Sequence, residues 1–240
     1  FFIDFIKMKK KNILGITLAR GGSKGIKKKN IQMLNGIPLI AYTIIEAKKS
    51  RLLTDFMVSS DDHEILEVTR DYGVITNYKR PTELAEDDTT SEDALIHAVN
   101  WMERTNKIKY DYIIELMCTN PLKTFHDIDG CINKLIKTEA QSVIGVTKLD
   151  DHHPARIKKI ENDRILDFCL PETSSRRQDL KPDAYIRNGS IYALRRDTLM
   201  VENKRFGSED SRPYIMPIER GVNIDNYLDL ELAEILLKKR

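Results

Sequence analysis

The feature that most constrains the fold of this chain is a short apolar run that leads directly into a glycine-rich, basic loop. The run spans Ile13–Leu18, and its β-favouring residues predict a strand that is buried on both faces. The loop reads Arg20-Gly21-Gly22-Ser23-Lys24-Gly25. Its glycines allow a sharp turn and bring backbone N–H groups close to an anion. A strand followed by such a loop is typical of a site that holds nucleotide phosphates.

Two familiar phosphate-binding motifs are nevertheless missing from the loop. It has neither the Walker A spacing, Gly-x-x-x-x-Gly-Lys-Ser/Thr, nor the dinucleotide fingerprint Gly-x-Gly-x-x-Gly. Positive charge continues through the three lysines at 27–29. Taken alone, the stretch fits a phosphate site and a solvated basic turn equally well, so the rest of the chain decides between them.

The composition of the chain bounds its class. Its 240 residues include 32% charged and 41% hydrophobic side chains, which is typical of a soluble globular protein. The net charge of +2 is nearly neutral, so the chain is not expected to bind nucleic acid, which needs an extended basic face. No apolar run is long enough to span a bilayer, so no membrane partner is predicted.

The cysteines and the first residues give two further expectations. Cys118, Cys131 and Cys169 are scattered and lack metal-ligand spacing, which predicts reduced thiols and a cytoplasmic location. Residues 1–7 precede Met8 and a lysine-rich lead-in to the first strand. We interpret them as an N-terminal extension outside the fold.

The remainder of the chain alternates between predicted strands and helices. Strands are expected at 55–61, 74–78, 112–118, 142–147 and 188–194, and helices at 38–50, 62–72, 90–104, 128–137 and after 226. This order predicts an α/β fold with a doubly wound, mainly parallel sheet. Ligands of such sheets bind beyond the carboxyl ends of the strands, where the glycine-rich loop, Asp61 and residues 118–123 would meet. The phosphate site is therefore favoured over the solvated turn.

Residues 148–182 interrupt this alternation. We predict that residues 8–147 and 183–240 form the nucleotide-binding core and that 148–182 is an inserted β-arm. Its apolar side chains have no evident place in the sheet, and an arm of this size cannot hold a core alone. A two-fold partner is the commonest way to cover such residues, so a homodimer is expected. The residues are Ile157, Ile160, Ile165, Leu166, Phe168 and Leu170.

An ordered set of short motifs resembles the acylneuraminate cytidylyltransferases, the CMP-sialic acid or CMP-nonulosonic acid synthetases. The matching stretches are 19–25, 29–30, 58–61, 80–85, 88–93, 152–154, 177–180 and 188–192. The resemblance spans nearly all of residues 13–237. It implies a Rossmann-like nucleotidyltransferase fold with a protruding arm for dimerisation. It also implies an enzyme that transfers CMP from CTP to the anomeric hydroxyl of a 2-keto sugar acid, with release of pyrophosphate.

The resemblance also implies roles for residues near CTP. Arg20 and Lys29 match catalytic positions that handle the triphosphate, where cations and backbone donors must be placed in advance. Gly21, Gly22, Ser23 and Lys24 would bind the nucleotide with them. Asn30, Arg80 and Ser91 match positions around cytidine. Ser91 has a second interpretation as a helix N-cap.

Asp225 is the expected ligand of Mg²⁺, because hard cations prefer carboxylate oxygen and bridge to phosphates. The sialic acid enzymes carry Asp-Ile-Asp here, whereas this chain reads Asn223-Ile224-Asp225. Asn223 can still offer a neutral oxygen to the metal or to a metal-bound water. Asp61 is a further candidate, with capping of the following helix as its alternative.

For the sugar acid, the matching positions are Arg156, Arg177, Gln178, Asn188 and Tyr192. A guanidinium group suits two-point capture of the sugar carboxylate. The resemblance further implies that the arm of one subunit lies near the sugar site of its partner, and Phe206 is expected to reach across as well.

One departure from the family bears on the sugar. Family members usually read Leu-Gln-Pro-Thr-Ser-Pro-Leu where this chain has Leu116-Met117-Cys118-Thr119-Asn120-Pro121-Leu122, so Met117 replaces a glutamine associated with the sugar. A thioether cannot donate hydrogen bonds, which favours a less hydroxylated, legionaminic-type acid. Two alternatives stay open. They are a shorter 2-keto sugar acid such as 3-deoxy-manno-octulosonate, and a non-catalytic protein that binds nucleotide sugars.

Overall fold

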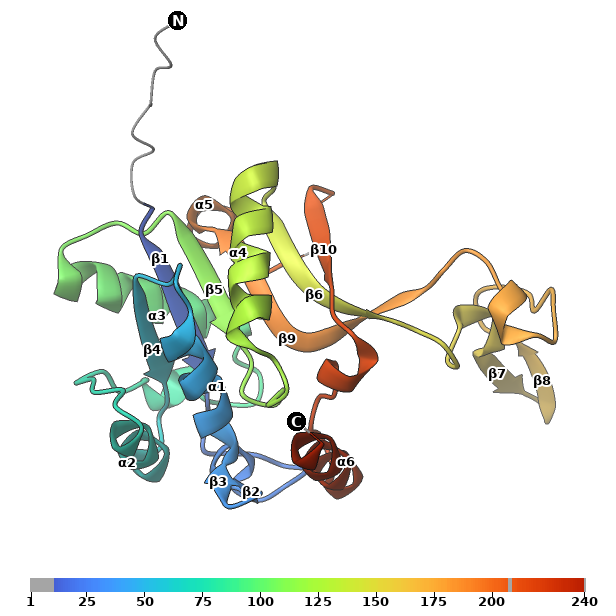
Figure 1. The fold of residues 1–240 in the computed structure, drawn as a ribbon, viewed down its shortest axis with the longest axis horizontal. Helices are drawn as coiled ribbons and strands as arrows, with labels where there is room; N and C mark the ends of the chain where they lie inside the picture. Colours follow the sequence, from blue (N-terminus) through green and yellow to red (C-terminus); the bar gives the residue numbers. More distant parts are fainter. Residues whose placement is uncertain (1–10, 207–208, 240) are drawn as a thin grey trace, which may run out of the picture.

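A six-stranded sheet in the order β10-β6-β9-β5-β1-β4 runs through the computed structural model, which describes residues 11–206 and 209–239 (Figure 1). β1 pairs in parallel with β4 and β5, and β10 pairs in parallel with β6. β9 runs antiparallel between β5 and β6. The α/β fold with a mainly parallel sheet is confirmed. Its strands are β1 (Ile13–Leu18), β4 (Asp55–Ser59), β5 (Tyr112–Leu116), β6 (Ser142–Lys148), β9 (Tyr185–Arg195) and β10 (Ser211–Ile215).

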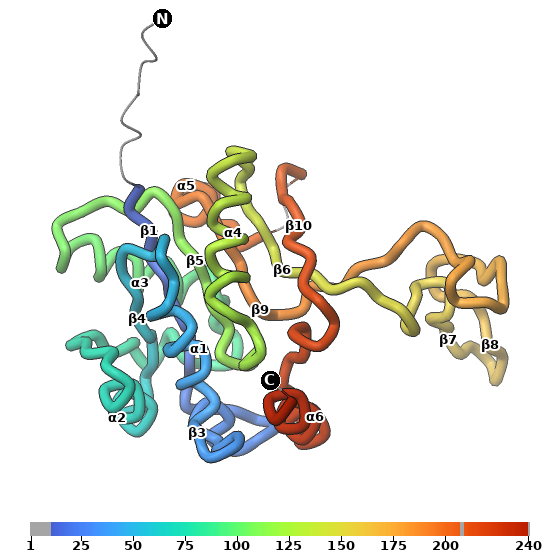
Figure 2. The backbone as a smooth tube through the Cα atoms, viewed as in Figure 1, coloured from blue at the N-terminus to red at the C-terminus, as the bar shows by residue number. Residues whose placement is uncertain are grey.

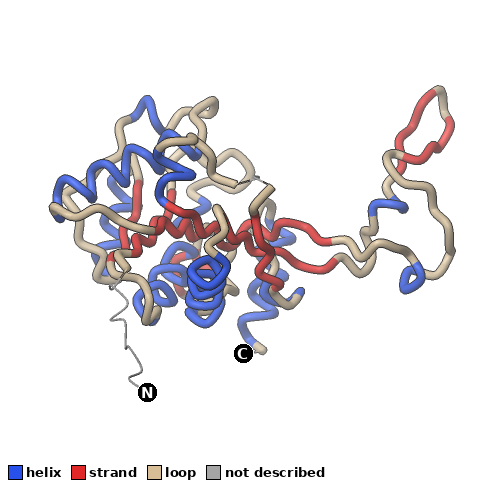
Figure 3. The backbone as a smooth tube through the Cα atoms, turned by 90° about the horizontal axis from the view of Figure 1, so that it is seen from above, coloured by secondary structure: helices blue, strands red, loops and turns tan. Residues whose placement is uncertain are grey.

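Helices cover both faces of the sheet, as the view from above shows (Figure 3). Side chains of α1 (Leu39–Lys49) and α4 (Phe125–Thr138) pack on one face together with Ile13 and Ile114. Side chains of α3 (Ser91–Asn106) and α5 (Arg196–Met200) pack on the other together with Leu14 and Ile113. Successive residues of each strand thus enter opposite cores, as the unbroken apolar runs require.

The smaller elements complete the fold. α2 (His63–Asp71) packs beside α1, and the closing helix α6 (Tyr227–Lys238) lies near the β2–β3 hairpin (Met33–Leu34 and Ile37–Pro38). Short 3₁₀ turns occupy Lys29–Ile31, Thr82–Leu84, Pro154–Arg156, Arg177–Asp179 and Ile218–Arg220. None of the helices in the described part of the chain is long and apolar enough to cross a bilayer.

The strand predicted at 74–78 is wrong, because this segment is irregular and lies outside the sheet. Val74 and Tyr78 are nevertheless buried, so the apolar pattern reflected packing against the helices rather than strand pairing. The proposed extension at 1–7 lies outside the described residues.

Residues 148–182 leave the sheet after β6 and return to it at β9, and the tube in Figure 2 shows them standing away from the body of the molecule. They contain an antiparallel hairpin of β7 (Lys158–Glu161) and β8 (Arg164–Asp167). Ile160 and Ile165 face each other across the hairpin and are about three-quarters exposed in this single chain. Phe168 is also exposed.

A buried lysine fixes the segment that follows β5. Lys123 is fully buried, and its Nζ donates to Thr43 Oγ1 on α1 (2.9 Å), to the Met117 carbonyl (2.7 Å) and to the Asn120 carbonyl. These bonds tie residues 117–123 to α1. Burial lowers the pKa of Lys123 to about 7.

Lys123 should give the stability of the protein a characteristic pH dependence. An unfolded lysine keeps its proton up to a pH of about 10.4. The unfolded chain therefore binds one proton more than the folded chain between pH 7 and about 10, so the unfolding free energy should rise with pH in this window. Lys123→Met should abolish this rise, and each carbonyl left without a donor should cost about 1–3 kcal/mol.

Urea unfolding at pH 7, 8 and 9 checks this prediction. Lys137→Met is the matched control, because Lys137 is exposed on α4 and should leave both the slope and the stability close to wild type. Identical pH slopes for wild type and Lys123→Met would contradict the assignment.

Candidate active site

The glycine-rich loop is held at the carboxyl edge of the sheet by the residues that follow β4. The Ala19 amide donates to the Ser59 carbonyl (2.9 Å), and the Gly21 amide donates to Asp61 Oδ1 (3.1 Å). A side chain at Gly21 would meet the carboxylate of Asp62 within 2.6 Å, so only glycine fits there. Asp61 therefore holds the loop, and the cap of α2 is Asp62, whose Oδ1 accepts from the Ile65 amide (3.1 Å). The capping alternative for Asp61 is wrong.

The basic side chains of the loop are paired with a neighbouring acidic segment. Arg20 donates to the Glu86 carbonyl (3.1 Å) and pairs with Asp87 (2.9 Å), and Lys24 also pairs with Asp87 (2.6 Å). The two cations hold the pKa of Asp87 below its usual range. These pairs are solvent-exposed and individually weak, so a phosphate group can displace the carboxylate at small cost.

A pocket of about 290 Å³ opens between the loop and α3, and Arg20, Arg80 and Ser91 line it. Arg80 is buried, with Nε bonded to Ser59 Oγ (3.0 Å) and Nη2 to the Ser59 carbonyl (2.5 Å), and burial lowers its pKa. Thr90, not Ser91, caps α3 by accepting from the Asp93 amide (3.2 Å). The capping interpretation of Ser91 is therefore wrong, and its hydroxyl is available to a ligand.

A more open hollow continues from this pocket along the glycine-rich loop. Gly22, Ser23 and Lys24 line it, and it shares Arg20 with the pocket beside α3. The structure thus brings six of the residues predicted for the nucleotide to one continuous surface. They are Arg20, Gly22, Ser23, Lys24, Arg80 and Ser91.

Asn30 lies beneath this surface instead of lining it. It is buried, its Nδ2 donates to the Arg20 carbonyl (2.8 Å), and its Oδ1 accepts from Cys118 Sγ (3.0 Å). Both ends of the amide are therefore used to hold the glycine-rich loop against the end of β5. In this arrangement Asn30 positions Arg20.

Lys29 and Asp225 meet at the other side of the loop. Lys29 Nζ donates to the Ile224 carbonyl (2.9 Å) and to Asp225 Oδ1 (3.0 Å), and Asn223 Nδ2 donates to Asp225 Oδ2 (2.6 Å). A side chain at Gly25 would meet the Asp225 carbonyl at 2.6 Å, so the two segments touch through their backbones. Residues far apart in the sequence thereby form one cluster.

This cluster fits a magnesium ion that takes most of its ligands from phosphates and water. The described residues contain no group of three or more His, Cys, Asp or Glu side chains that could enclose a metal. Asp225 offers a single exposed carboxylate. Asn223 turns its Nδ2 toward Asp225, and its buried Oδ1, which lies beside Gly189, has no hydrogen-bond partner among the described residues, so the amide must turn over before this oxygen can face a metal at Asp225. Mg²⁺ commonly binds through one or two carboxylates together with substrate phosphates, which this donor set allows.

The residues predicted for the sugar acid do not come together in one chain. Arg177 and Gln178 line a hollow of about 330 Å³ at the base of the arm. Arg156 lies within the arm and pairs with Asp151 (3.5 Å) and Glu172 (3.4 Å). None of these three lines the pocket beside α3.

The other two predicted sugar residues lie on β9 in the main sheet. Asn188 is buried, and its Nδ2 donates to Thr147 Oγ1 (3.1 Å). Tyr192 is nearly buried and stacks with Phe206, the two ring centroids lying 5.5 Å apart. Phe206 therefore packs within its own chain here.

A buried ion pair was missed by the reading of the sequence. Glu115, on β5, is fully buried, and its carboxylate accepts two hydrogen bonds from Arg205, one of them from Nη2 (2.9 Å). Burial raises the pKa of Glu115, and the Arg205 charge opposes this shift. The available signal was a lone carboxylate in the otherwise apolar strand Tyr112–Leu116.

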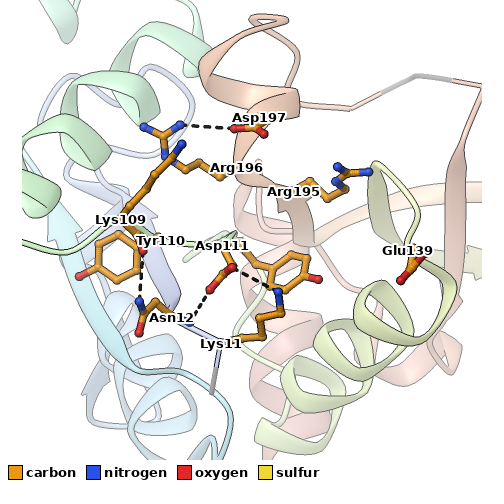
Figure 4. A pocket seen from close by; sticks show the side chains of 10 residues that line it. Lys11, Asn12, Lys109, Tyr110, Asp111, Glu139, Arg195, Arg196 and Asp197 are labelled. Carbon is orange, nitrogen blue, oxygen red and sulfur yellow. Dashed lines mark hydrogen bonds and ion pairs between the residues drawn. The ribbon is translucent and has the colours of Figure 1, made fainter. Parts of the chain in front are cut away.

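A separate pocket of about 530 Å³ lies at the opposite edge of the sheet, where β1 and β5 begin (Figure 4). Four of its charged groups form ion pairs, Lys11 with Asp111 (3.3 Å) and Arg196 with Asp197 (3.4 Å). Parallel sheets of this kind bind ligands at the carboxyl edge, so we assign the candidate active site to the glycine-rich loop and the pocket beside α3.

Several known proteins are similar to this chain along most of its length. A pseudaminic acid cytidylyltransferase from Campylobacter jejuni is 32% identical over 225 residues, which cover 94% of this chain and 96% of that protein. A CMP-N,N'-diacetyllegionaminic acid synthase from the same species is 29% identical, with 94% of each chain covered. The solved structure of a CMP:2-keto-3-deoxy-manno-octonic acid synthetase complexed with CTP shares the fold, with a TM-score of 0.71 at 16% identity over 95% of this chain and 99% of the other.

The model of one protein family, described as cytidylyltransferase, matches residues 14–236. This match runs from the first strand through the glycine-rich loop, the pocket beside α3 and Asp225 into the closing helix. The chain belongs to the cytidylyltransferase family.

Proposed function

We propose that the chain transfers CMP from CTP to the anomeric hydroxyl of a nonulosonic acid and releases pyrophosphate. The observation that carries this proposal is the continuous surface on which Arg20, Arg80 and Ser91 meet the glycine-rich loop in a member of this family. Relatives that match along most of the chain carry the names of pseudaminic and legionaminic acid enzymes, which supports the substrate class.

The residues suggest how the site handles the nucleotide. The pocket beside α3 is of the size expected for part of a small-molecule site, and Ser91 and Arg80 offer polar contacts to cytidine. Arg20 and Lys24 would exchange Asp87 for the triphosphate, to which the loop amides also donate. The oxygen of the anomeric hydroxyl then bonds to the α-phosphorus as the bond to the leaving pyrophosphate breaks, and the hydroxyl proton passes to water. Lys29 lies where it can balance the charge that develops on the phosphates.

Mg²⁺ is part of this proposal, with Asp225 as its carboxylate ligand and Asn223 as a neutral oxygen donor beside it. The ion would neutralise phosphate charge and hold the triphosphate in a reactive geometry. Lys29 now pairs with Asp225 (3.0 Å), so the carboxylate must release this lysine when phosphates and metal arrive.

We further propose a legionaminic-type acid as the sugar, because Met117 lines the pocket where a glutamine would offer an amide. A shorter 2-keto sugar acid remains the second candidate. The fold neighbour that uses an octulosonic acid shares only 16% of its residues with this chain, so it does not favour that substrate. The third candidate is a non-catalytic protein that binds nucleotide sugars, and it is motivated by Asn223 and Met117.

We place the enzyme in the cytoplasm, and its three free cysteines suit a reducing compartment.

The arm supports a homodimer. Its exposed Ile160, Ile165 and Phe168 need a covering surface, and Arg156, Arg177 and Gln178 lie too far out on the chain to line the pocket beside α3. A two-fold partner resolves both points, because its arm can cover apolar surface and bring these polar residues to the sugar site of the first subunit.

The function is tested by measuring pyrophosphate release from CTP and Mg²⁺ with a panel of sugar acids, together with the mass of the product. The panel should contain neuraminic-, legionaminic- and pseudaminic-type acids and 3-deoxy-manno-octulosonate. We expect release with a nonulosonic acid, none without sugar and none in excess chelator. Release with the octulosonate alone would favour the second candidate. Tight CTP binding without release from any acid would favour a non-catalytic protein.

The phosphate end of the site is tested by Arg20→Met, Lys29→Met and Asp225→Asn. Each should lower kcat by about 10²–10³-fold, the usual cost of losing one preorganised charge contact in the transition state. Lys48→Met is the control, because Lys48 is exposed on α1 and bonds only to the Tyr72 carbonyl among the described residues. Near-normal kcat in all three site variants would contradict the phosphate site and support the alternative interpretation of the loop as a solvated basic turn.

The dimer is tested by light scattering. Wild type should have twice the mass of one chain, and Ile165→Asp should be monomeric with a raised KM for the sugar acid. Lys159→Asp, on the alternate face of the same hairpin, should remain dimeric. A fully active wild-type monomer at assay concentration would refute the proposal.

A further inference from the structure

Arg205 occupies an unusual position between the candidate nucleotide pocket and β9. Its Nε and Nη2 donate to the buried Glu115 carboxylate, and Nη2 also lies 3.3 Å from Met117 Sδ. Glu115 and Met117 both line the pocket beside α3. Arg205 therefore stands directly behind two residues of the pocket wall.

Aromatic stacking fixes the plane of this guanidinium group. The Arg205 Cζ atom lies 4.3 Å from the centre of the Tyr192 ring, and Tyr192 stacks on Phe206. Arg187 Cζ lies 4.1 Å from the centre of the Phe206 ring. The guanidinium of Arg205 is thus held by a two-point ion pair and by a ring, so it cannot turn freely.

One nitrogen of Arg205 is left over. Nη1 makes no hydrogen bond to the described residues. A guanidinium has five N–H donors, and the Glu115 carboxylate and the Met117 sulfur use those on Nε and Nη2. Arg205 therefore presents a fixed, charged donor that is unused among the described residues and lies behind Met117 in the pocket wall.

The Arg205 guanidinium lies next to Met117, a side chain that has no hydrogen-bond donor. Met117 cannot donate a hydrogen bond to a polar group of the substrate, and its sulfur instead accepts a hydrogen bond from Arg205. Arg205 does not itself line the pocket beside α3, but a ligand that extends past Met117 would approach its guanidinium group, which no motif of the sequence assigned to the site.

We propose that Arg205 is a substrate-binding residue that donates from Nη1 to an oxygen of the sugar acid and replaces the donor that Met117 cannot supply. The inference rests on the proposed cytidylyltransferase function and deepens it by naming a determinant of sugar recognition. The oxygen is either the carboxylate or a carbonyl or hydroxyl substituent on the sugar ring, and both accept from a guanidinium. Glu115 acts as the positioning residue that holds Arg205 in place.

The test uses the double variant Glu115→Gln/Arg205→Met, which removes both charges and leaves no unpaired buried ion. Its KM for the sugar acid should rise by about 10–100-fold, the usual loss for one hydrogen bond from a charged donor. The KM for CTP should change less than twofold. Lys204→Met is the matched control and should behave as wild type, because Lys204 is on the same segment and its side chain pairs, among the described residues, with Glu202 alone (3.1 Å).

A competition experiment separates the two oxygen sources. The sugar acid and its C1 amide are compared as competitive ligands of wild type and double variant. If Arg205 binds the carboxylate, the preference for the acid over the amide should shrink in the variant. If it binds a ring substituent, both ligands should weaken equally and the preference should persist. Either result supports contact with the sugar.

An active double variant with a wild-type KM for the sugar acid would overturn the inference and leave the proposed function standing. A wild-type protein that releases no pyrophosphate with any sugar acid would instead remove the proposed function, and this inference with it. If circular dichroism shows that the double variant does not fold, Arg205→Lys replaces it. A lysine can keep the ion pair with Glu115 but has no second nitrogen to replace Nη1. An unchanged KM for the sugar acid in this variant would therefore also overturn the inference.

Discussion

The candidate active site depends on the buried amino group of Lys123. This group ties residues 117–123 to α1 through two backbone carbonyls and Thr43. The fixed segment then holds two others. Cys118 donates to Asn30, which in turn holds the Arg20 carbonyl, and the Thr119 carbonyl accepts from the Ile224 amide (2.8 Å) next to Asp225. One buried lysine side chain thus anchors the segment that contacts both the phosphate loop and the candidate metal ligand.

The charges of the site neutralise one another when no nucleotide is bound. Arg20 and Lys24 share Asp87, and Lys29 pairs with Asp225. Exposed pairs of this kind contribute little to stability, so their exchange for a triphosphate costs little and leaves the side chains close to where they are needed. Two fully buried titratable side chains are used differently. Lys123 holds backbone carbonyls in place, and Glu115 holds Arg205.

The local parts of the fold were predictable from sequence because their causes are local. The apolar run at 13–18 and the glycines after it specify a buried strand and a tight loop, and the structure contains both. The prediction at 74–78 failed because burial against helices produces the same apolar spacing as a strand. The roles of Lys123 and Glu115 could not be predicted from the sequence. Their partners lie up to 90 positions away, and a lone charged residue in an apolar stretch does not reveal which group will neutralise it.

The most direct test of the central claim, that nucleotide binds where the glycine-rich loop meets the pocket beside α3, is a crystal structure of the protein with CTP and Mg²⁺. We expect the cytosine beside Arg80 and Ser91, the phosphates against Gly21, Gly22 and Lys24, and Lys29 turned from Asp225 toward the triphosphate. CTP bound instead at the opposite edge of the sheet, in the pocket lined by Lys11, Lys109 and Arg195, would contradict the claim.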